Sequence, residues 1–245
     1  MNTLARLLVI FSFLPAFAIA HAQEGDVITE IDVAENSKTT DETVILIADV
    51  EKGDRWSPAL GETIKENLIS SGLFKSVKVF TGPTREGVGV RLTILAEEKF
   101  SWVIGPTFYN QPGNYGGGVG FLEANLFGEN KKFLIYAQYA SADSLFVTTY
   151  WDPAIAGTRF SWRVFVFGRR ENVTEYTYVN PSQFIGQPEP DRLSTLNQLS
   201  LGLLVGVNLW RGLTLDAEIT PGYFSFDNAE NLRDPNMATI LPQDD

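Results

Sequence analysis

The chain of 245 residues contains no cysteine and a single histidine, His21. Without cysteine there are no disulfides, no thiolate metal sites and no lipidated cysteine behind an export signal. His21 lies in a segment that we expect to be removed, so histidine-based catalytic triads and the usual zinc sites are excluded. A secreted hydrolase would need a Ser-Lys or paired-carboxylate site, and no persuasive carboxylate pair is present. We therefore expect no enzymatic activity and no cofactor.

Positive charge is also scarce. The chain has 19 Lys and Arg residues but 30 Asp and Glu residues, which gives a net charge of -11. Binding to nucleic acid needs a basic face that neutralises phosphates, so nucleic acid is not an expected partner. What the chain does contain is 21 glycines and 12% aromatic residues. High glycine and aromatic content at moderate hydrophobicity favours β structure over a helical bundle.

Residues 1–22 have the pattern of an export signal. Arg6 precedes an apolar run that extends from Leu7 to Ala20. The run is followed by the small-x-small pattern of a signal peptidase site, in which Ala20 and Ala22 are the small residues. The run is short for a permanent membrane helix, which needs about 20 apolar residues. We expect a signal peptide that is removed before Gln23, with a retained membrane anchor as the alternative.

Residues 26–98 predict a small α+β domain that begins with a strand and a helix. The alternation of VITEIDV (27–33) is typical of a strand. Thr39 and Glu42 are spaced as the capping box of a first helix, and Gly53 ends the segment that contains it.

The second helix of this segment has clear signals at both ends. Ser57 is a good N-cap residue, and Pro58 stands at the first helical position. Gly72 is placed to take a left-handed conformation after the last turn. Strands over 74–80 and 88–98 complete the order β-α-α-β-β.

These residues resemble the polypeptide-transport-associated (POTRA) domain family. In that family a Gly-Leu-Phe sequence at a helix end leads into a strand with valines, and the last strand ends in a Glu-Lys pair that leads into the membrane. The residues that match are Gly72, Leu73, Phe74, Val77 and Val79, together with Glu98 and Lys99. Apart from any family role, the same residues are also expected to form the hydrophobic core between helix and sheet. The resemblance implies a sheet edge that binds client strands by β-augmentation.

Residues 100–245 predict a partial transmembrane β-barrel of about seven antiparallel strands. Segments 159–167, 199–209 and 213–220 alternate, with long apolar faces opposite faces of Gly, Ser, Asn and charged residues. Aromatic residues gather near segment ends, as at membrane interfaces. We also expect short inner turns and longer outer loops, with the outer loops at Gln111–Gly117 and at about 168–196, although the outer loop at 140–144 is brief.

The segment GGGVGFLEANLFGENKK resembles the second barrel strand of the BamA/TamA outer-membrane assembly superfamily. In that superfamily a glycine-rich strand ends in Asn-Leu-Phe-Gly before a tight turn, which Asn125, Leu126, Phe127 and Gly128 match. The glycines are not a phosphate-binding loop, because no Lys-Ser or Lys-Thr follows them. Glycine in a barrel strand instead marks a bend or a close approach of backbones.

The resemblance is incomplete in the length of the barrel. Superfamily members have sixteen strands and a late Arg-Gly-Phe motif, and the 245 residues hold neither. An open sheet edge in lipid leaves backbone groups unsatisfied at several kcal/mol each. We therefore expect a truncated product, with one protomer of a multichain barrel and a smaller closed barrel as alternatives.

The resemblance implies a component of outer-membrane protein assembly or polypeptide transport, located in the outer membrane with its N-terminal domain in the periplasm. Its expected partners are membrane lipid, unfolded outer-membrane or secreted polypeptides, and periplasmic or lipoprotein accessory subunits. A two-partner-secretion transporter and a porin-like surface antigen without client handling are the alternatives.

Overall fold

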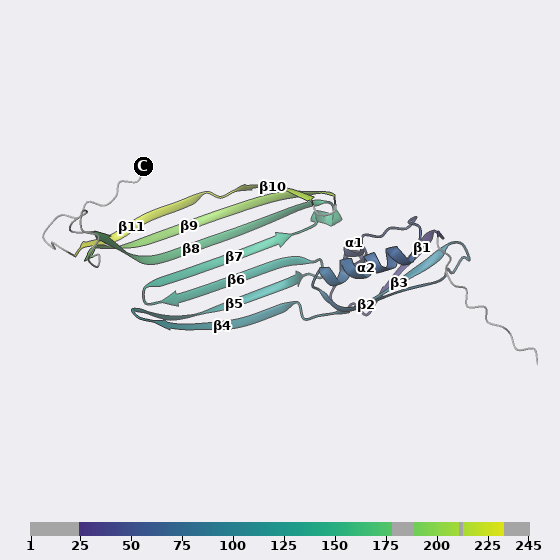
Figure 1. The fold of residues 1–245 in the computed structure, drawn as a ribbon, viewed down its shortest axis with the longest axis horizontal. Coiled ribbons are helices and arrows are strands. Elements are labelled where there is room, and N and C mark those ends of the chain that lie inside the picture. The colour runs from purple at the N-terminus through teal and green to yellow at the C-terminus, as the bar shows by residue number, and fades with distance from the viewer. Residues whose placement is uncertain (1–24, 178–188, 211–212, 233–245) are drawn as a thin grey trace, which may run out of the picture.

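The computed structural model describes residues 25–177, 189–210 and 213–232, which form two separate β-sheets (Figure 1). A small sheet with two helices comes first in the chain. A larger antiparallel sheet follows after three linking residues, 99–101. The expected signal peptide, with Ala20 and Ala22, lies outside the described residues.

The N-terminal unit has the element order β1-α1-α2-β2-β3, as the sequence predicted. Its elements are β1 (Ile28–Ala34), α1 (Asp41–Ala48), α2 (Pro58–Ser70), β2 (Phe74–Pro83) and β3 (Val90–Glu98). The sheet order is β1-β3-β2, with β1 parallel and β2 antiparallel to β3. Apolar side chains of both helices pack on this sheet and form the main buried core, which includes Val44, Ile64, Leu68, Phe74, Leu92 and Ile94.

Two details of this unit differ from the prediction. The N-cap of α1 is Thr40, whose hydroxyl accepts from the backbone N–H of Thr43, and not Thr39. The alternation of β1 is interrupted by a register shift between Ile28 and Glu30, so Ile28 is fully buried while Ile31 packs at the edge of the core. Both differences come from tertiary contacts that local spacing does not encode.

The large sheet contains eight strands that occupy seven positions. In sheet order β4 to β9 are neighbours, and β10 and β11 both pair with β9 as two halves of one edge strand interrupted at Thr220 and Pro221. The count of about seven strands therefore describes the sheet positions. The strands are β4 (Trp102–Gln111), β5 (Asn114–Leu126), β6 (Lys131–Ala140), β7 (Asp143–Asp152), β8 (Phe160–Thr177), β9 (Glu189–Trp210), β10 (Leu213–Ile219) and β11 (Gly222–Asn231).

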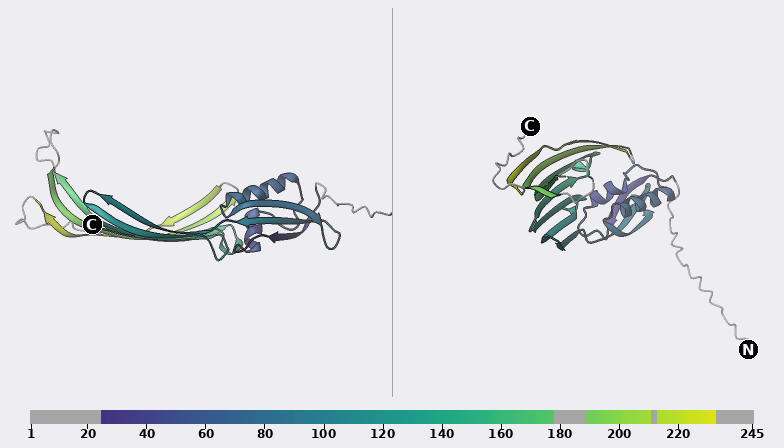
Figure 2. Two further views of the ribbon diagram at one scale, coloured as in Figure 1. Left: turned by 90° about the horizontal axis from the view of Figure 1, so that it is seen from below. Right: turned by 60° about the vertical axis from the view of Figure 1, so that its left-hand side comes forward.

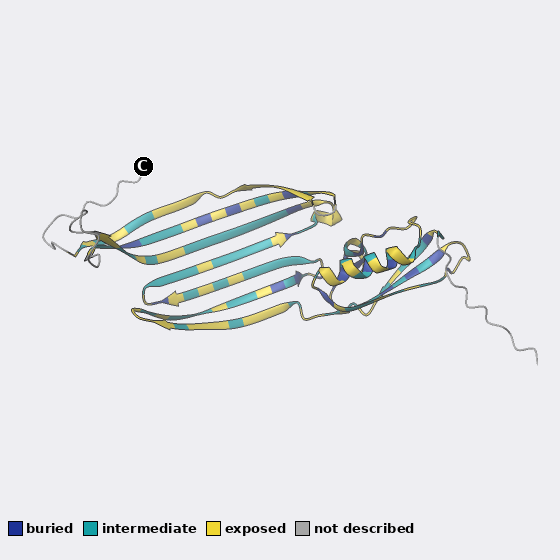
Figure 3. Cartoon of the chain, viewed as in Figure 1, coloured by how far each residue is buried: buried dark blue, intermediate teal, exposed yellow. Residues whose placement is uncertain are grey.

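The two faces of the large sheet differ in chemistry. Cross-strand register places Ile104, Phe121 and Ile135 on one face, which we call the outward face. Its apolar side chains are widely exposed, and Figure 3 shows how much of the sheet stays uncovered. The inward face is mixed, because it carries glycines, hydroxyls, amides and charged groups together with apolar side chains such as Leu122, Leu134 and Phe165. In residues 159–167 and 199–209, the side chains predicted to share an apolar face lie together on the outward face. The exposed outward members include Phe108, Tyr139, Phe146, Leu199, Leu201, Leu203, Val205, Leu215 and Ile219.

The expected outer loop at Gln111–Gly117 is wrong, and the bounds of the expected outer loop at 168–196 are too wide. At the end far from the helices, Pro112 and Gly113 form a two-residue turn, so the expected loop at Gln111–Gly117 is largely strand. The expected loop at 168–196 is also mostly strand, because β8 continues to Thr177 and β9 begins at Glu189. Its charged residues pair with one another, as Arg192 does with Glu175. The polar parts of β8 and β9 have the composition of a loop, and for this reason the sequence predicted a loop there.

The large sheet is curved but open in the part of the chain that the structure describes. Its edges are β4 on one side and β10 with β11 on the other, and the two further views in Figure 2 show the bend. The expected partial barrel is therefore a curved, unclosed sheet. None of the described helices is long and apolar enough to cross a membrane.

Candidate functional site

The unpaired edges of β2 and β4 lie on the same side of the chain, whereas the unpaired edge of β10 and β11 lies on the opposite side of the large sheet. β2 pairs only with β3, and β4 pairs only with β5. Both edges face the lower side in Figure 1, and the view from below in Figure 2 brings them to the front. Exposed backbone groups on such edges are ready to pair with another strand.

The opposite edge of the small sheet is partly covered. The backbone N–H of Ile28 donates to the carbonyl of Asp54 (2.8 Å), and its carbonyl accepts from Gly53 (2.8 Å). The backbone N–H of Trp56 donates to the backbone carbonyl of Asp26 (2.8 Å). The start of β1 therefore already has a backbone partner, which leaves β2 as the more open edge of this sheet.

The junction between the two sheets is built on the Asn-Leu-Phe-Gly turn. Asn125 is buried, and its Nδ2 donates to Thr39 Oγ1 (2.8 Å). The backbone N–H of Thr40 donates to the carbonyl of Gly128 (3.0 Å). A Cβ on Gly128 would lie 2.0 Å from the carbonyl oxygen of Lys38, and the φ of Gly128 is +76°. The turn therefore docks against the residues that start α1, and only glycine fits at position 128.

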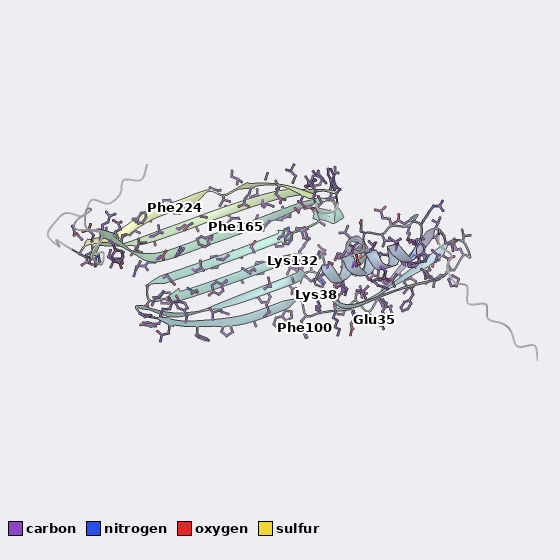
Figure 4. The ribbon with its side chains drawn as sticks, viewed as in Figure 1. Glu35, Lys38, Phe100, Lys132, Phe165 and Phe224 are labelled. Carbon is purple, nitrogen blue, oxygen red and sulfur yellow. The ribbon has the colours of Figure 1, made fainter. Side chains whose placement is uncertain are left out.

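An ion pair crosses the same junction. Lys38 Nζ lies 2.6 Å from Glu123 Oε2 and donates to Ser101 Oγ (2.9 Å), and Figure 4 places Lys38 where the two sheets meet. The side chain of Glu123 is only 7% exposed, and its Oε1 accepts from the backbone N–H of Asn125 (2.7 Å). A buried carboxylate needs both a cation and hydrogen-bond donors, which this arrangement provides.

Glu98 orders the segment that enters this junction. Its carboxylate accepts from the backbone N–H groups of Thr39 (2.6 Å) and Lys38 (3.0 Å) and from Ser37 Oγ (2.7 Å). Burial alone would raise the pKa of Glu98, but the hydrogen bonds from Thr39, Ser37 and Lys38 outweigh it and lower the pKa to about 2. The charged form is therefore the one that holds the loop.

This depressed pKa predicts an acid-sensitive junction. A carboxylate whose pKa falls on folding stabilises the folded state. This stabilisation is fully present when the pH is above the pKa in the unfolded chain, near 4.5, and is lost as the pH falls toward 2. A Glu98→Gln variant should lose about 1.5–3 kcal/mol at neutral pH, the usual contribution of hydrogen bonds to a charged group. Urea unfolding at a series of pH values measures this loss, which should shrink as the pH approaches 2. A loss that does not vary with pH would contradict the role of the charge.

Side chains on the inward face hold the edge strand β4 to strands further inside the sheet. Tyr136 Oη on β6 lies 3.0 Å from Thr107 Oγ1 on β4 and donates to Gln138 Oε1 (2.7 Å). The intervening strand β5 has glycines on this face, and a Cβ on Gly118 would lie 3.0 Å from Tyr136 Oη. Tyr109 of β4 likewise reaches Asp143 at the start of β7, with Oη 2.8 Å from Oδ1. The glycine row therefore lets side chains bond across β5.

We expect a Tyr136→Phe variant to loosen β4 while the sheet stays folded. The change removes one hydroxyl that bridges β4 and β6, and such a bond contributes about 0.5–1.5 kcal/mol. Amide hydrogen exchange of β4 should become faster. Tyr139→Phe is the matched control, because Tyr139 is 78% exposed on the outward face. Equal exchange rates in the two variants would show that the hydroxyl does not hold the edge.

The sequence-predicted residues fall into two groups. Gly72 follows α2 with a φ of +78°, and Leu73 and Phe74 are buried beside it, with Val77 packed against the same core. Asn125 and Gly128 contact the N-terminal unit directly, while Phe127 takes a φ of +61° and is exposed. The structure adds three junction residues, namely Lys38, Glu98 and Glu123. Only Glu98 had a signal in the sequence, through the family pattern. In the described ranges no cluster of three acidic or histidine side chains could hold a metal ion.

Comparison with known proteins identifies the fold. No family profile matches the chain, and no curated protein is similar to it in sequence. Among solved structures, BamA from Haemophilus ducreyi lacking POTRA domains 1–3 is similar with a TM-score of 0.52 and 12% identity, over 82% of this chain and 43% of that one. CdiB from Acinetobacter baumannii is similar with a TM-score of 0.51 and 12% identity, over 84% and 39%. The chain thus spans less than half the length of either structure. The described part of the chain therefore has a fold similar to that of BamA and CdiB, in agreement with the fold that the sequence resemblance implied.

Proposed function

We propose that the chain takes part in the assembly or transport of outer-membrane proteins and makes no covalent bonds. Residues 26–98 act as a POTRA domain in the periplasm, and the large sheet lies in the outer membrane with its outward face in lipid. The fold supports this assignment. The match to BamA covers 82% of this chain, which is more residues than the segment after Lys99 contains. The similarity therefore extends into the N-terminal unit.

The free edges of β2 and β4 on one side of the chain carry the proposal. An unfolded client adds a strand to β2 through backbone hydrogen bonds, which need no particular client sequence. The three linking residues keep β4 close, so the same client meets a second free edge at the membrane. The side-chain bonds of Thr107 and Tyr109 hold β4 in register while it acts as a template.

Site-specific disulfide trapping tests this function, since the chain has no cysteine of its own. Lys78→Cys places a thiol on β2 and Ile104→Cys places one on β4, and Glu66→Cys on α2 is the exposed control. An unfolded small barrel protein with one strand cysteine serves as the client. We expect disulfides from positions 78 and 104 and little from position 66. Equal yields at all three positions, or none, would overturn the proposal.

Transport of a polypeptide is the second candidate, because the likeness to CdiB is as close as the likeness to BamA. The fate of the trapped client separates the two. Assembly leaves it folded in the membrane and resistant to protease, whereas transport leaves it outside in a protease-sensitive form. A fixed channel without client handling would give neither product.

A further inference from the structure

A hollow of 640 Å³ lies between helix α1 and two turns at the helix-proximal end of the large sheet. We call it the α1 groove and define it by Glu42, Leu46, Asp49, Glu51, Glu129 and Ala156, which line it. Its volume is within the range of about 300–1,000 Å³ that is typical of ligand pockets. It accommodates a few side chains and not a folded domain.

The inner wall of the groove is apolar although the fold does not need it to be. Helix α1 buries Val44 and Ala48 in the core of the N-terminal unit. Ile45 and Leu46 line the groove instead, and Leu46 remains 43% exposed. Ala154 and Ala156 form the facing wall. An isolated exposed leucine is common on protein surfaces, but apolar side chains that line a concave site mark a place for a ligand.

The rim of the groove is acidic. Among the residues with described positions, no Lys or Arg forms an ion pair with Glu42, Asp49 or Glu51. Lys131, the cation among the described residues that line the groove, already has its Nζ 2.5 Å from Glu129 Oε2 and 3.5 Å from Asp152 Oδ2. Anionic lipid headgroups are therefore repelled, and cationic groups are attracted.

We propose that the α1 groove binds a polypeptide segment with one or two large apolar side chains flanked by Lys or Arg, carried by a separate protein. The apolar side chains contact Ile45 and Leu46, and the cations pair with the carboxylates of the rim. This surface is separate from the β2 and β4 edges, so a bound partner leaves the proposed client sites open. The inference goes beyond client handling and does not depend on it.

A short synthetic peptide tests the proposal on the full chain refolded in uncharged detergent micelles. The probe is a capped Lys-Leu-Leu-Lys peptide, with Glu-Leu-Leu-Glu and Lys-Ser-Ser-Lys peptides as controls. Backbone NMR shifts of Leu46 and Ala156 report binding. The E42K/E51K double variant reverses two exposed rim charges and should weaken binding about tenfold, as expected for several exposed ion pairs lost together. The E66K variant makes the same kind of charge change on α2, outside the groove, and is the control.

The expected result is saturable binding of the Lys-Leu-Leu-Lys peptide alone, weakened in the E42K/E51K variant and unchanged in the E66K variant. Equal affinity for the Lys-Ser-Ser-Lys peptide would show that general charge attraction suffices, and would overturn the proposal. Equal affinity in the wild-type chain and the E42K/E51K variant, or no binding at all, would overturn it as well. Client trapping at β2 and β4 is a separate measurement, so failure here does not affect the proposed function.

Discussion

A Gly128→Ala variant is expected to destabilise the chain by about 3 kcal/mol and to separate the two sheets at their junction. Two costs add at this position. A residue with a Cβ in the left-handed region costs about 1–2 kcal/mol, and overpacking in a tight contact costs about 1–3 kcal/mol. The contacted atom is the carbonyl oxygen of Lys38, 2.0 Å from the added Cβ, and backbone cannot move aside as a flexible side chain can.

The matched control for this variant is Gly113→Ala. Gly113 has nearly the same backbone conformation, with a φ of +79°, but a Cβ there meets nothing within 4 Å. Only the conformational cost of about 1–2 kcal/mol should appear. Urea unfolding measures both variants, and amide exchange of Thr40, which bonds to the carbonyl of Gly128, reports the junction. Equal destabilisation with an unchanged Thr40 would show that the close approach has no structural role.

Leu203→Lys is expected to cost about 2–4 kcal/mol of folding stability in a lipid bilayer, the usual penalty for a lysine on the lipid face near the membrane centre. Leu203 is on the outward face, 42% exposed, near the middle of the apolar run of β9. Its neighbours across the sheet are Val164 and Ile219, which offer no counter-charge. The measurement is urea unfolding from lipid vesicles.

The neighbouring Leu204→Lys variant separates the lipid effect from a general intolerance of lysine. Leu204 is on the inward face, where its register neighbours are Arg163 on β8 and Glu218 on β10, whose Nη2 and Oε2 lie 3.7 Å apart. A lysine at this position meets one like charge and one opposite charge and stays outside the lipid, so we expect a change below about 1 kcal/mol. Comparable losses in both variants would contradict the assignment of the two faces.

Periodicity in the sequence was enough to predict the strands and their faces. Period-two alternation in 199–209 assigned Leu203 and Leu204 to opposite faces, because a strand has no other way to orient consecutive side chains. The start of α2 was equally predictable, since Ser57 and Pro58 act within one turn. Polar strands were not, because Arg170 and Glu175 lack the apolar partner face on which the pattern depends.

The junction could not be derived from the residues that build it. Asn125 and Thr39 are far apart in the chain, and no local spacing predicts that they bond. The two neighbouring threonines thus have different roles, because the hydroxyl of Thr39 bonds to Asn125 while the hydroxyl of Thr40 caps α1. The Asn-Leu-Phe-Gly turn had been expected to reverse the chain. In the structure it also docks the N-terminal unit.

The most direct test of the membrane assignment is spin-label accessibility along β9 in lipid vesicles. A nitroxide can be attached to single cysteines at positions 201, 203, 204, 205 and 208, because the chain contains no other cysteine. At 201, 203 and 205 we predict high accessibility to oxygen, which concentrates in lipid. At 204 and 208 we predict higher accessibility to a water-soluble nickel complex. Absence of this alternation, or the opposite phase, would contradict a sheet whose outward face meets lipid.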